Sequence, residues 1–221
     1  MTNPWKDGPE PDRTISYGDA LDQIIDFYDG NVNGPLVTLI HGGYWRPAHT
    51  RVHMRALAGK LATNGFQVAN IEYRRDLENP KKLFEDVNSA LKHLTESIAL
   101  IGFSVGGQLA LISESQAHKL ILLAPITDLQ RTKDENLGDG AVDAYFGPTD
   151  LKEFDPFLKN YDQHLFIIHG DADDRVPLEH SRDFAKSKGA ALMEISGADH
   201  FAMVDPDGIA FELILHTLLS K

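Results

Sequence analysis

Short apolar runs alternate with amphipathic stretches along most of this 221-residue chain, and no other feature limits the fold as strongly. The runs are apolar throughout rather than at every second position, as expected of strands that are buried on both faces. The clearest of them lie at residues 35–40, 66–71, 98–101, 120–123, 165–168 and 191–195. Apolar residues recur at helical spacing within the stretches 50–64, 83–94, 105–112, 178–188 and 209–218. This repetition predicts an α/β fold, with a mostly parallel sheet and helices on both of its faces.

Two shorter segments and one long gap in the pattern complete the expected architecture. Residues 14–17 and 24–28 are typical of short strands, and we expect them to form a hairpin at one edge of a sheet of about eight strands. We treat 1–221 as a single domain, because its length suits one domain and no linker or internal repeat interrupts it. Residues 125–162 lack a long periodic pattern but contain several aromatic residues. This segment is either a lid or substrate-facing excursion, or a surface excursion with a short helix.

Charge and cysteine content disfavour several kinds of function. The net charge of −12 opposes binding to nucleic-acid phosphates and to anionic membranes. The chain has no cysteine, which excludes disulfides, thiolate nucleophiles and cysteine-ligated metal sites. Because no apolar stretch has the length of a membrane span and residues 1–13 lack the pattern of a signal peptide, we expect a cytoplasmic protein. Its expected partner is a small-molecule substrate, not a nucleic acid or a membrane, and a homodimer is left open.

A G-x-S-x-G pattern lies where a predicted strand ends and a predicted helix begins, at Gly102-Phe103-Ser104-Val105-Gly106. A sharp turn at such a junction pushes the serine hydroxyl clear of the sheet, and the glycines leave the room that the turn requires. The alternative is a tight packing turn with an incidental serine. The position of the pattern favours Ser104 as a nucleophile.

A serine hydroxyl needs a base to take its proton, and two later loops supply candidates for this task. The carboxyl ends of parallel strands meet at one edge of a sheet, so groups that follow them come together. His200 follows the strand at 191–195. Three carboxylates follow the strand at 165–168, namely Asp171, Asp173 and Asp174. The order serine, carboxylate, histidine is that of a catalytic triad built on such a turn, but spacing alone does not choose among the carboxylates. A calcium loop is disfavoured, because the other ligands of an EF-hand are missing.

A third motif directly follows the strand at 35–40 and reads His41-Gly42-Gly43-Tyr44-Trp45. Acyl transfer develops a negative charge on the carbonyl oxygen, and backbone N–H groups aimed at that oxygen stabilise it. A glycine pair lets the main chain approach a substrate carbonyl closely. The candidate oxyanion-hole residues are Gly42, Gly43, Tyr44 and Val105, the last at the positive end of the helix that follows the serine. A plain turn is the alternative for the glycine pair taken alone.

These motifs together resemble the α/β-hydrolase superfamily, and the resemblance runs along essentially the whole chain. Residues 169–177 are similar to the HGxxDxxVP segment of that superfamily, which implies that Asp173 is the carboxylate of the triad. The HGGxW motif at 41–45 and the segment Glu72-Tyr73-Arg74-Arg75 are similar to those of small esterases with a minimal lid and of kynurenine formamidases (arylformamidases). Phe103 and Val105 depart from the histidine and alanine that many relatives carry beside the serine.

The resemblance implies a serine hydrolase that cleaves a small carboxylic ester or an aryl N-formamide through an acyl-enzyme. In this interpretation Ser104 is the nucleophile, His200 is the general base and acid, and Asp173 orients the imidazole. Candidates for an aromatic substrate-binding wall are Trp45, Phe103 and Phe201. The alternative is that these side chains only pack in the core. No metal and no organic cofactor are expected, because the serine, its base and water suffice. The alternatives are a peptidase-like hydrolase and a non-catalytic binding protein on the same fold.

Overall fold

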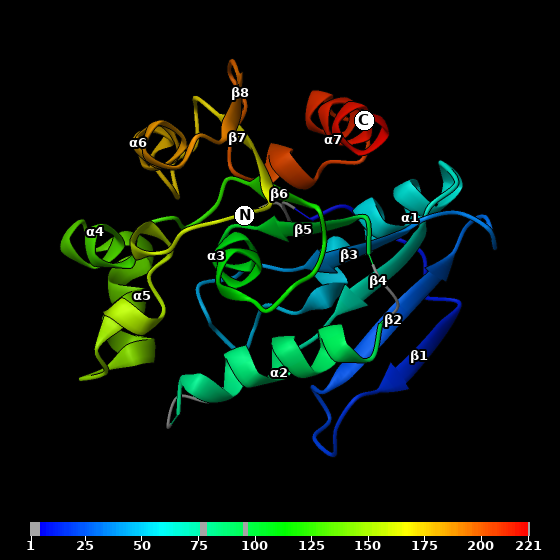
Figure 1. The fold of residues 1–221 in the computed structure, drawn as a ribbon, viewed down its shortest axis with the longest axis horizontal. Coiled ribbons are helices and arrows are strands. Elements are labelled where there is room, and N and C mark those ends of the chain that lie inside the picture. The colour runs from blue at the N-terminus through cyan, green and yellow to red at the C-terminus, as the bar shows by residue number, and fades with distance from the viewer. Residues whose placement is uncertain (1–4, 76–78, 95–96, 221) are drawn as a thin grey trace.

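The computed structural model describes residues 5–75, 79–94 and 97–220. Within them, eight strands form one sheet in the order β1-β2-β4-β3-β5-β6-β7-β8 (Figure 1). β1 (Arg13–Ser16) and β2 (Ile24–Asp29) form the expected antiparallel hairpin at one edge, and β2 also runs antiparallel to β4 (Gln67–Ile71). The remaining pairs are parallel and involve β3 (Leu36–Ile40), β5 (Ala99–Phe103), β6 (Lys119–Leu123), β7 (His164–Gly170) and β8 (Ala191–Ile195). The mostly parallel sheet that the sequence predicts is confirmed.

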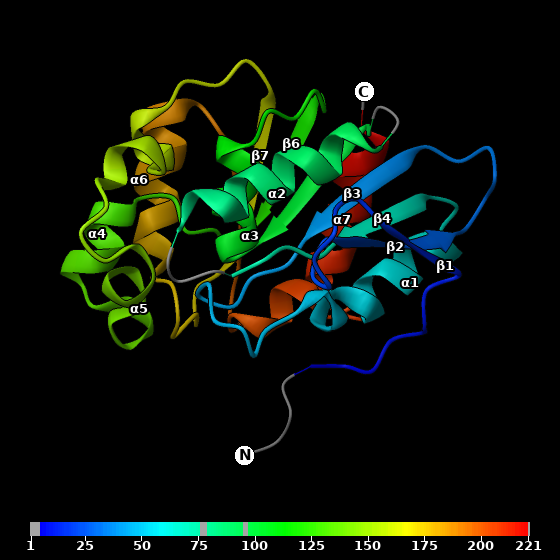
Figure 2. The ribbon, with the colours of Figure 1, turned by 90° about the horizontal axis from the view of Figure 1, so that it is seen from below.

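Helices cover both faces of this sheet. One face carries α2 (Lys81–Lys92), α3 (Val105–Ile112) and α6 (Leu178–Lys188), and the other carries α1 (Arg55–Thr63) and α7 (Ile209–Leu219). Figure 2 shows α2 and α3 in front of the strands and α7 behind them. The stretch expected as a helix at 50–64 begins instead with a 3₁₀ turn (Arg51–Met54) before α1.

The hydrophobic core is divided in two by the sheet, and strand residues alternate between the two halves. In β6, Leu120 and Leu122 join the cluster under α2 and α3, whereas Ile121 and Leu123 join the cluster under α1 and α7. All four are buried, and each such side chain contributes about 1.5–3 kcal/mol on burial. Burial on both sides explains why the strands are apolar at every position instead of every second one.

The segment 125–162 folds into short helices packed on the core. It contains α4 (Leu129–Asp134), α5 (Leu137–Phe146) and two 3₁₀ turns (Leu151–Glu153 and Pro156–Leu158). Periodicity missed α5 because Gly138, Asp139 and Gly140 have positive φ and interrupt its first turn. Tyr145 and Phe146 are nonetheless buried against the rest of the molecule.

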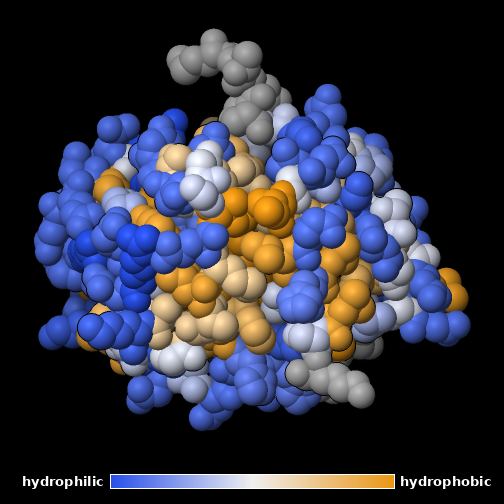
Figure 3. Space-filling model, turned by 90° about the horizontal axis from the view of Figure 1, so that it is seen from above, coloured by the Kyte–Doolittle hydropathy of each residue, from blue (hydrophilic) through white to orange (hydrophobic). Residues whose placement is uncertain are grey.

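The side of the molecule that carries β8, α6 and α7 has a marked apolar surface. Figure 3 shows it as a hydrophobic area between hydrophilic borders. The exposed apolar residues of α7 are Ile209 and Leu219, and Met193 of the edge strand β8 is partly exposed. Among the described residues, no helix combines the length and the apolar character that a membrane crossing requires.

Candidate active site

Ser104 occupies a strained turn between β5 and α3. Its φ of 55° and ψ of −117° are unfavourable for a residue with a side chain. The turn is tight, because a Cβ at Gly102 would lie 2.2 Å from the carbonyl oxygen of Gly106. A Cβ at Gly106 would in turn lie 2.0 Å from the carbonyl oxygen of Ile40 in β3. The structure confirms the sharp strand-to-helix turn that the sequence predicts, and it shows that both glycines are sterically required.

The three candidate carboxylates have different partners. Asp173 Oδ2 lies 2.6 Å from His200 Nδ1, and both side chains are buried. Asp171 instead accepts a hydrogen bond from Gly197 N at 2.6 Å, and Asp174 pairs with Arg175 at the surface. Since a carboxylate oxygen can only accept, His200 donates from Nδ1, which leaves the Nε2 lone pair of a neutral ring free to take a proton.

The Asp173 carboxylate is held from several sides. Its Oδ1 accepts hydrogen bonds from the N–H groups of Arg175 and Val176, each at 2.8 Å. His169 Nε2 lies 3.1 Å from Oδ2, while His169 Nδ1 accepts from Ser181 Oγ at 2.7 Å. Burial alone would raise the pKa of Asp173, but the hydrogen bonds from His169 and His200 outweigh it and hold this pKa below its usual range. Asp173 is therefore ionised, and His169 fixes its position.

Ser104 and His200 line the same cavity, which has a volume of about 280 Å³. The described contacts include no hydrogen bond between the Ser104 hydroxyl and His200. The His200 ring packs near the Phe103 ring, with the two centroids 4.8 Å apart. Contacts between a nucleophile and its base are often long in ligand-free enzymes and tighten when substrate binds. The hydroxyl, the imidazole and the carboxylate thus come from three distant loops to one place.

The loop after β3 has an unusual run of residues with positive φ. Gly43, Tyr44 and Trp45 all have positive φ, at 125°, 49° and 59°. Within the described part of the chain, the N–H groups of Gly43 and Tyr44 donate to no protein acceptor. The N–H of Val105, at the start of α3, likewise has no acceptor among the described residues. These three donors are free to meet a negative oxygen near Ser104.

A buried ionic network supports this loop from behind. Glu72, at the end of β4, lies 2.9 Å from His41 Nε2 and also accepts from the Arg51 N–H and from Arg75. His41 Nδ1 lies 2.8 Å from the Gly42 carbonyl oxygen. Burial would raise the pKa of Glu72, but its contacts with His41, Arg75 and Arg51 hold this pKa below the usual range. The loops that follow β3 and β4 are therefore fixed to each other by charge.

Two of the three residues expected to form an aromatic substrate-binding wall lie at the cavity. Phe103 and Phe201 line the cavity, together with Tyr44 of the oxyanion loop. Trp45 corrects the expectation, because it is 1% exposed and does not line the cavity. Its ring stacks on Tyr145 and its Nε1 donates to Gln108 at 3.2 Å. The positive φ at Trp45 turns the side chain into the core, and Trp45 is a packing residue.

Four residues that sequence reasoning missed also line the cavity. They are Trp5, Arg46, His49 and Arg175. The motifs could have indicated three of them, because Arg46 and His49 follow the motif at 41–45 closely and Arg175 lies within the segment 169–177. Trp5 had no such signal, because it precedes the first strand and reaches the site only through the tertiary structure. The lining includes no residue of 125–162 from the described chain, and that segment touches the site through Arg46, which donates to the Gly138 carbonyl.

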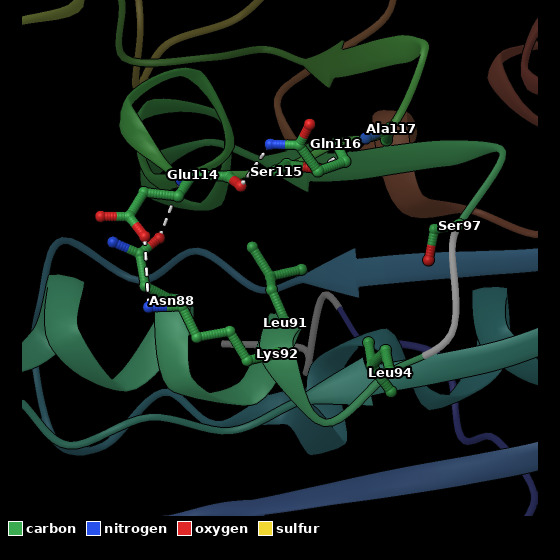
Figure 4. A pocket seen from close by; sticks show the side chains of 9 residues that line it. All are labelled: Asn88, Leu91, Lys92, Leu94, Ser97, Glu114, Ser115, Gln116 and Ala117. Atoms are coloured by element: carbon green, nitrogen blue, oxygen red, sulfur yellow. Dashed lines mark hydrogen bonds and ion pairs between the residues drawn. The ribbon is translucent and has the colours of Figure 1, made fainter.

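A larger cavity, of about 500 Å³, lies at the other end of the sheet. Figure 4 shows its lining, to which Leu91 and Leu94 contribute from the end of α2 and the following turn. Its polar side chains are engaged with one another, since Lys92 pairs with Glu114 and Asn88 accepts from the Glu114 N–H. It opens at the amino ends of β5 and β6, away from Ser104. Among the described residues, no group of three or more histidine, aspartate and glutamate side chains is arranged to hold a metal ion.

Solved structures with the same fold include several hydrolases. Esterase B from Lactobacillus rhamnosis superposes with a TM-score of 0.77 at 17% identity, covering 96% of this chain and 86% of that one. Esterase 2 from Thermogutta terrifontis, phosphonylated by sarin, gives a TM-score of 0.76 at 19% identity, covering 98% and 95%. A putative thioesterase from a Silicibacter species gives 0.75 at 20% identity, covering 92% and 86%. At these identities the likeness establishes the α/β-hydrolase fold.

Comparison by sequence gives one match, to a family profile. No curated protein matches the chain significantly. The sequence profile of the BD-FAE family matches residues 25–159, which is more than half of the chain. The matched part begins within β2 and contains the loop after β3, the Ser104 turn and the elements from β3 to α5. The chain belongs to the BD-FAE family.

Proposed function

We propose that this protein is a serine hydrolase that cleaves a small carboxylic ester through an acyl-enzyme intermediate. One observation carries the proposal: the hydrogen-bonded pair of His200 and Asp173 shares a cavity with Ser104 on its strained turn. A buried ionised carboxylate that orients an imidazole beside a serine hydroxyl lining the same cavity is the arrangement that activates serine.

The reaction follows from the positions of these groups. The Ser104 oxygen attacks the ester carbonyl while His200 Nε2 takes the hydroxyl proton. The carbonyl oxygen becomes negative and accepts hydrogen bonds from the N–H groups of Gly43, Tyr44 and Val105, each of which is worth about 3 kcal/mol of barrier. The alcohol leaves with the proton from His200. Water then attacks the acyl-serine, giving a proton to His200, which returns it to the Ser104 oxygen as the bond to the acyl group breaks and the acid is released.

Gly42 has a different part in this proposal. A Cβ at this position would lie 2.8 Å from the Ser104 Cβ and 2.7 Å from the Phe103 carbonyl oxygen. Gly42 therefore allows the oxyanion loop to approach the nucleophile, while its carbonyl receives the contact from His41. We assign it to the shape of the oxyanion hole rather than to donation.

Proteins of the same fold support this reaction class. Similar structures include esterase 2 from Thermogutta terrifontis phosphonylated by sarin and esterase B from Lactobacillus rhamnosis inhibited by a tributyrin phosphonate. Phosphonates of this kind imitate the tetrahedral stage of ester hydrolysis. The proposal for this chain extends that chemistry to Ser104.

The cavity also favours a second substrate class. Its walls carry the rings of Trp5, Tyr44, Phe103 and Phe201, and a flat aryl group fits such a lining. An aryl N-formamide combines an aryl ring with the smallest acyl group, and the same steps cleave it with an amine as leaving group. Comparing nitrophenyl acetate and butyrate with an aryl N-formamide such as N-formylkynurenine tests this, and a higher kcat/KM for the formamide favours it over the ester.

Covalent labelling tests the reaction class directly. We expect a fluorophosphonate probe to label the wild-type protein, Ser104→Ala to abolish labelling, and esterase kcat to fall by at least roughly 10³-fold in this variant. Ser113→Ala is the matched control, because that hydroxyl lies at the end of α3, where it donates to the Ala110 carbonyl. A folded wild-type protein that takes no label and turns over no ester would instead be a binding protein.

A further inference from the structure

Trp5 stands between the catalytic cavity and a second cavity. The second cavity has a volume of about 430 Å³, and its lining includes Ala56 of α1 and Ala202 in the turn after His200. The two cavities have two lining residues in common, Trp5 and Phe201. The two rings meet edge to face, with centroids 5.0 Å apart and an angle of 83°. They form the wall that divides one space from the other.

The Trp5 indole is fixed by contacts on several sides. It stacks on the His53 ring at 4.0 Å with an angle of 2°, and it meets the Phe103 ring edge to face at 6.1 Å. Burial lowers the pKa of His53 to about 4, so that the ring beneath the indole is neutral at physiological pH. A neutral imidazole is a flat, weakly hydrated partner for an indole face.

The neighbouring backbone holds this position as well. Lys6 Nζ lies 2.6 Å from Asp205 Oδ1, which ties the segment to the turn before α7. Gly8 lies directly on α1, since a Cβ there would be 2.2 Å from the Ala56 nitrogen. Glu10 forms an ion pair with Arg55. Contacts on either side of Trp5 thus fix the indole against the cavity.

We propose that Trp5 is the specificity-determining residue that limits the length of the substrate, by closing the catalytic cavity against the second cavity. This inference rests on the proposed function. With the indole in place, a substituent on the ester carbonyl is confined to about 280 Å³. Without it, the catalytic cavity opens into the further 430 Å³ beyond. Trp5 lies outside residues 25–159, the part of the chain that matches the BD-FAE family.

The test compares substrate series in Trp5→Ala and in the wild-type protein. One series varies the acyl chain of nitrophenyl esters from acetate through butyrate and octanoate to decanoate, and the other varies the alcohol of acetate esters from methyl to octyl. In at least one series, we expect the ratio of kcat/KM for long over short substrates to rise by about tenfold or more in Trp5→Ala. Trp5→Phe should lie between the two proteins, because its smaller ring closes less of the opening. The series that responds identifies the end of the ester that faces Trp5.

A second substitution distinguishes space from loosened structure. Ala202→Leu fills part of the second cavity, and in the Trp5→Ala background it should remove the gain for long substrates. Fluorophosphonate labelling confirms that Ser104 remains competent in each variant. If Trp5→Ala does not fold, Trp5→Leu keeps an apolar side chain there and should show the same shift.

Two results separate failure of this inference from failure of the proposed function. Unchanged length profiles in both series, with normal labelling and normal hydrolysis of butyrate, would overturn the role of Trp5 and leave the hydrolase intact. A gain for long substrates that survives Ala202→Leu would also overturn it. Absence of labelling and of ester hydrolysis in the folded wild-type protein would instead remove the proposed function and this inference with it.

Discussion

At the scale of single residues, environment separates side chains that look equivalent in the sequence. Asp173 and Asp174 are neighbours in one turn, yet Asp173 is buried against two histidines whereas the side chain of Asp174 is 74% exposed beside Arg175. Hydrogen bonds hold the pKa of Asp173 below its usual range, so the carboxylate beside the His200 imidazole is ionised at neutral pH. The difference arises from burial and partners rather than from residue type.

The substitution Asp173→Asn tests this difference. An amide at this position no longer selects the His200 tautomer that leaves Nε2 free, and we expect kcat for a short ester to fall by roughly 10³- to 10⁴-fold. Asp174→Asn is the matched control, and its kcat should stay within about twofold of wild type, because that side chain is mostly exposed and, among the described residues, pairs with Arg175 alone. Comparable losses in both variants would contradict the assignment of Asp173.

At the scale of elements, the active edge of the sheet is held together by ionic contacts between loops. The loop after β3 supplies oxyanion donors, and Glu72 at the end of β4 ties it to Arg51 and Arg75. Glu72 is 1% exposed, so each of its hydrogen bonds replaces solvation that it lost on folding. This network therefore helps to fix the position of the loop.

Replacement of Glu72 should destabilise the protein in a pH-dependent way. Because its pKa is lower in the folded protein than the ordinary value of 4.5, the ionised group stabilises the fold above that pH, and this contribution is lost as the pH falls further. We expect Glu72→Gln to lower the unfolding free energy by about 3 kcal/mol at pH 7, and by progressively less below pH 4.5. Urea denaturation of both proteins at several pH values measures this difference in unfolding free energy.

The exposed pair of Lys81 and Glu153 provides the control for this experiment. Glu153→Gln should change the unfolding free energy by less than about 1 kcal/mol at any pH, because water already solvates both groups. A difference between wild type and Glu72→Gln that stays constant into acid would show that Glu72 acts through its shape and not through its charge.

At the scale of the whole molecule, one sheet and its two core halves hold all the parts of the site. The segment 125–162 joins this core through Tyr145 and Phe146, which pack against Trp45. Trp45 in turn bonds to Gln108 of α3, and Gln108 donates to the Phe154 carbonyl. These contacts favour one cooperative unit, although the predicted movement of this segment as a lid stays a prediction.

Thermal unfolding tests this cooperativity. In the Trp5→Phe variant only Trp45 remains as a tryptophan, since the chain contains two. We expect its fluorescence and the far-UV circular dichroism to change at the same midpoint, because the contacts of Trp45 belong to the common core. A fluorescence transition several degrees below the circular dichroism transition would show that 125–162 separates from the sheet independently.

Much of the fold could be predicted because its signals are local. Continuous apolar runs indicate strands that are buried on two faces. A serine between glycines at the end of such a strand indicates a sharp turn that few other residues permit. The family resemblance then selected Asp173 where spacing left three carboxylates open. Periodicity did not predict the helices of 125–162, because positive φ at residues 138–140 interrupts the helical repeat in α5.

The sequence by itself therefore determined the order of strands and helices, the parallel sheet and the Ser104 turn, since each depends on backbone preference and on neighbouring residues. Only the tertiary structure decided where the aromatic side chains lie. It turned Trp45 into the core and brought Trp5 to the wall of the cavity. The orientations of these two side chains depend on packing against residues far away in the chain, and a local sequence pattern does not identify those partners.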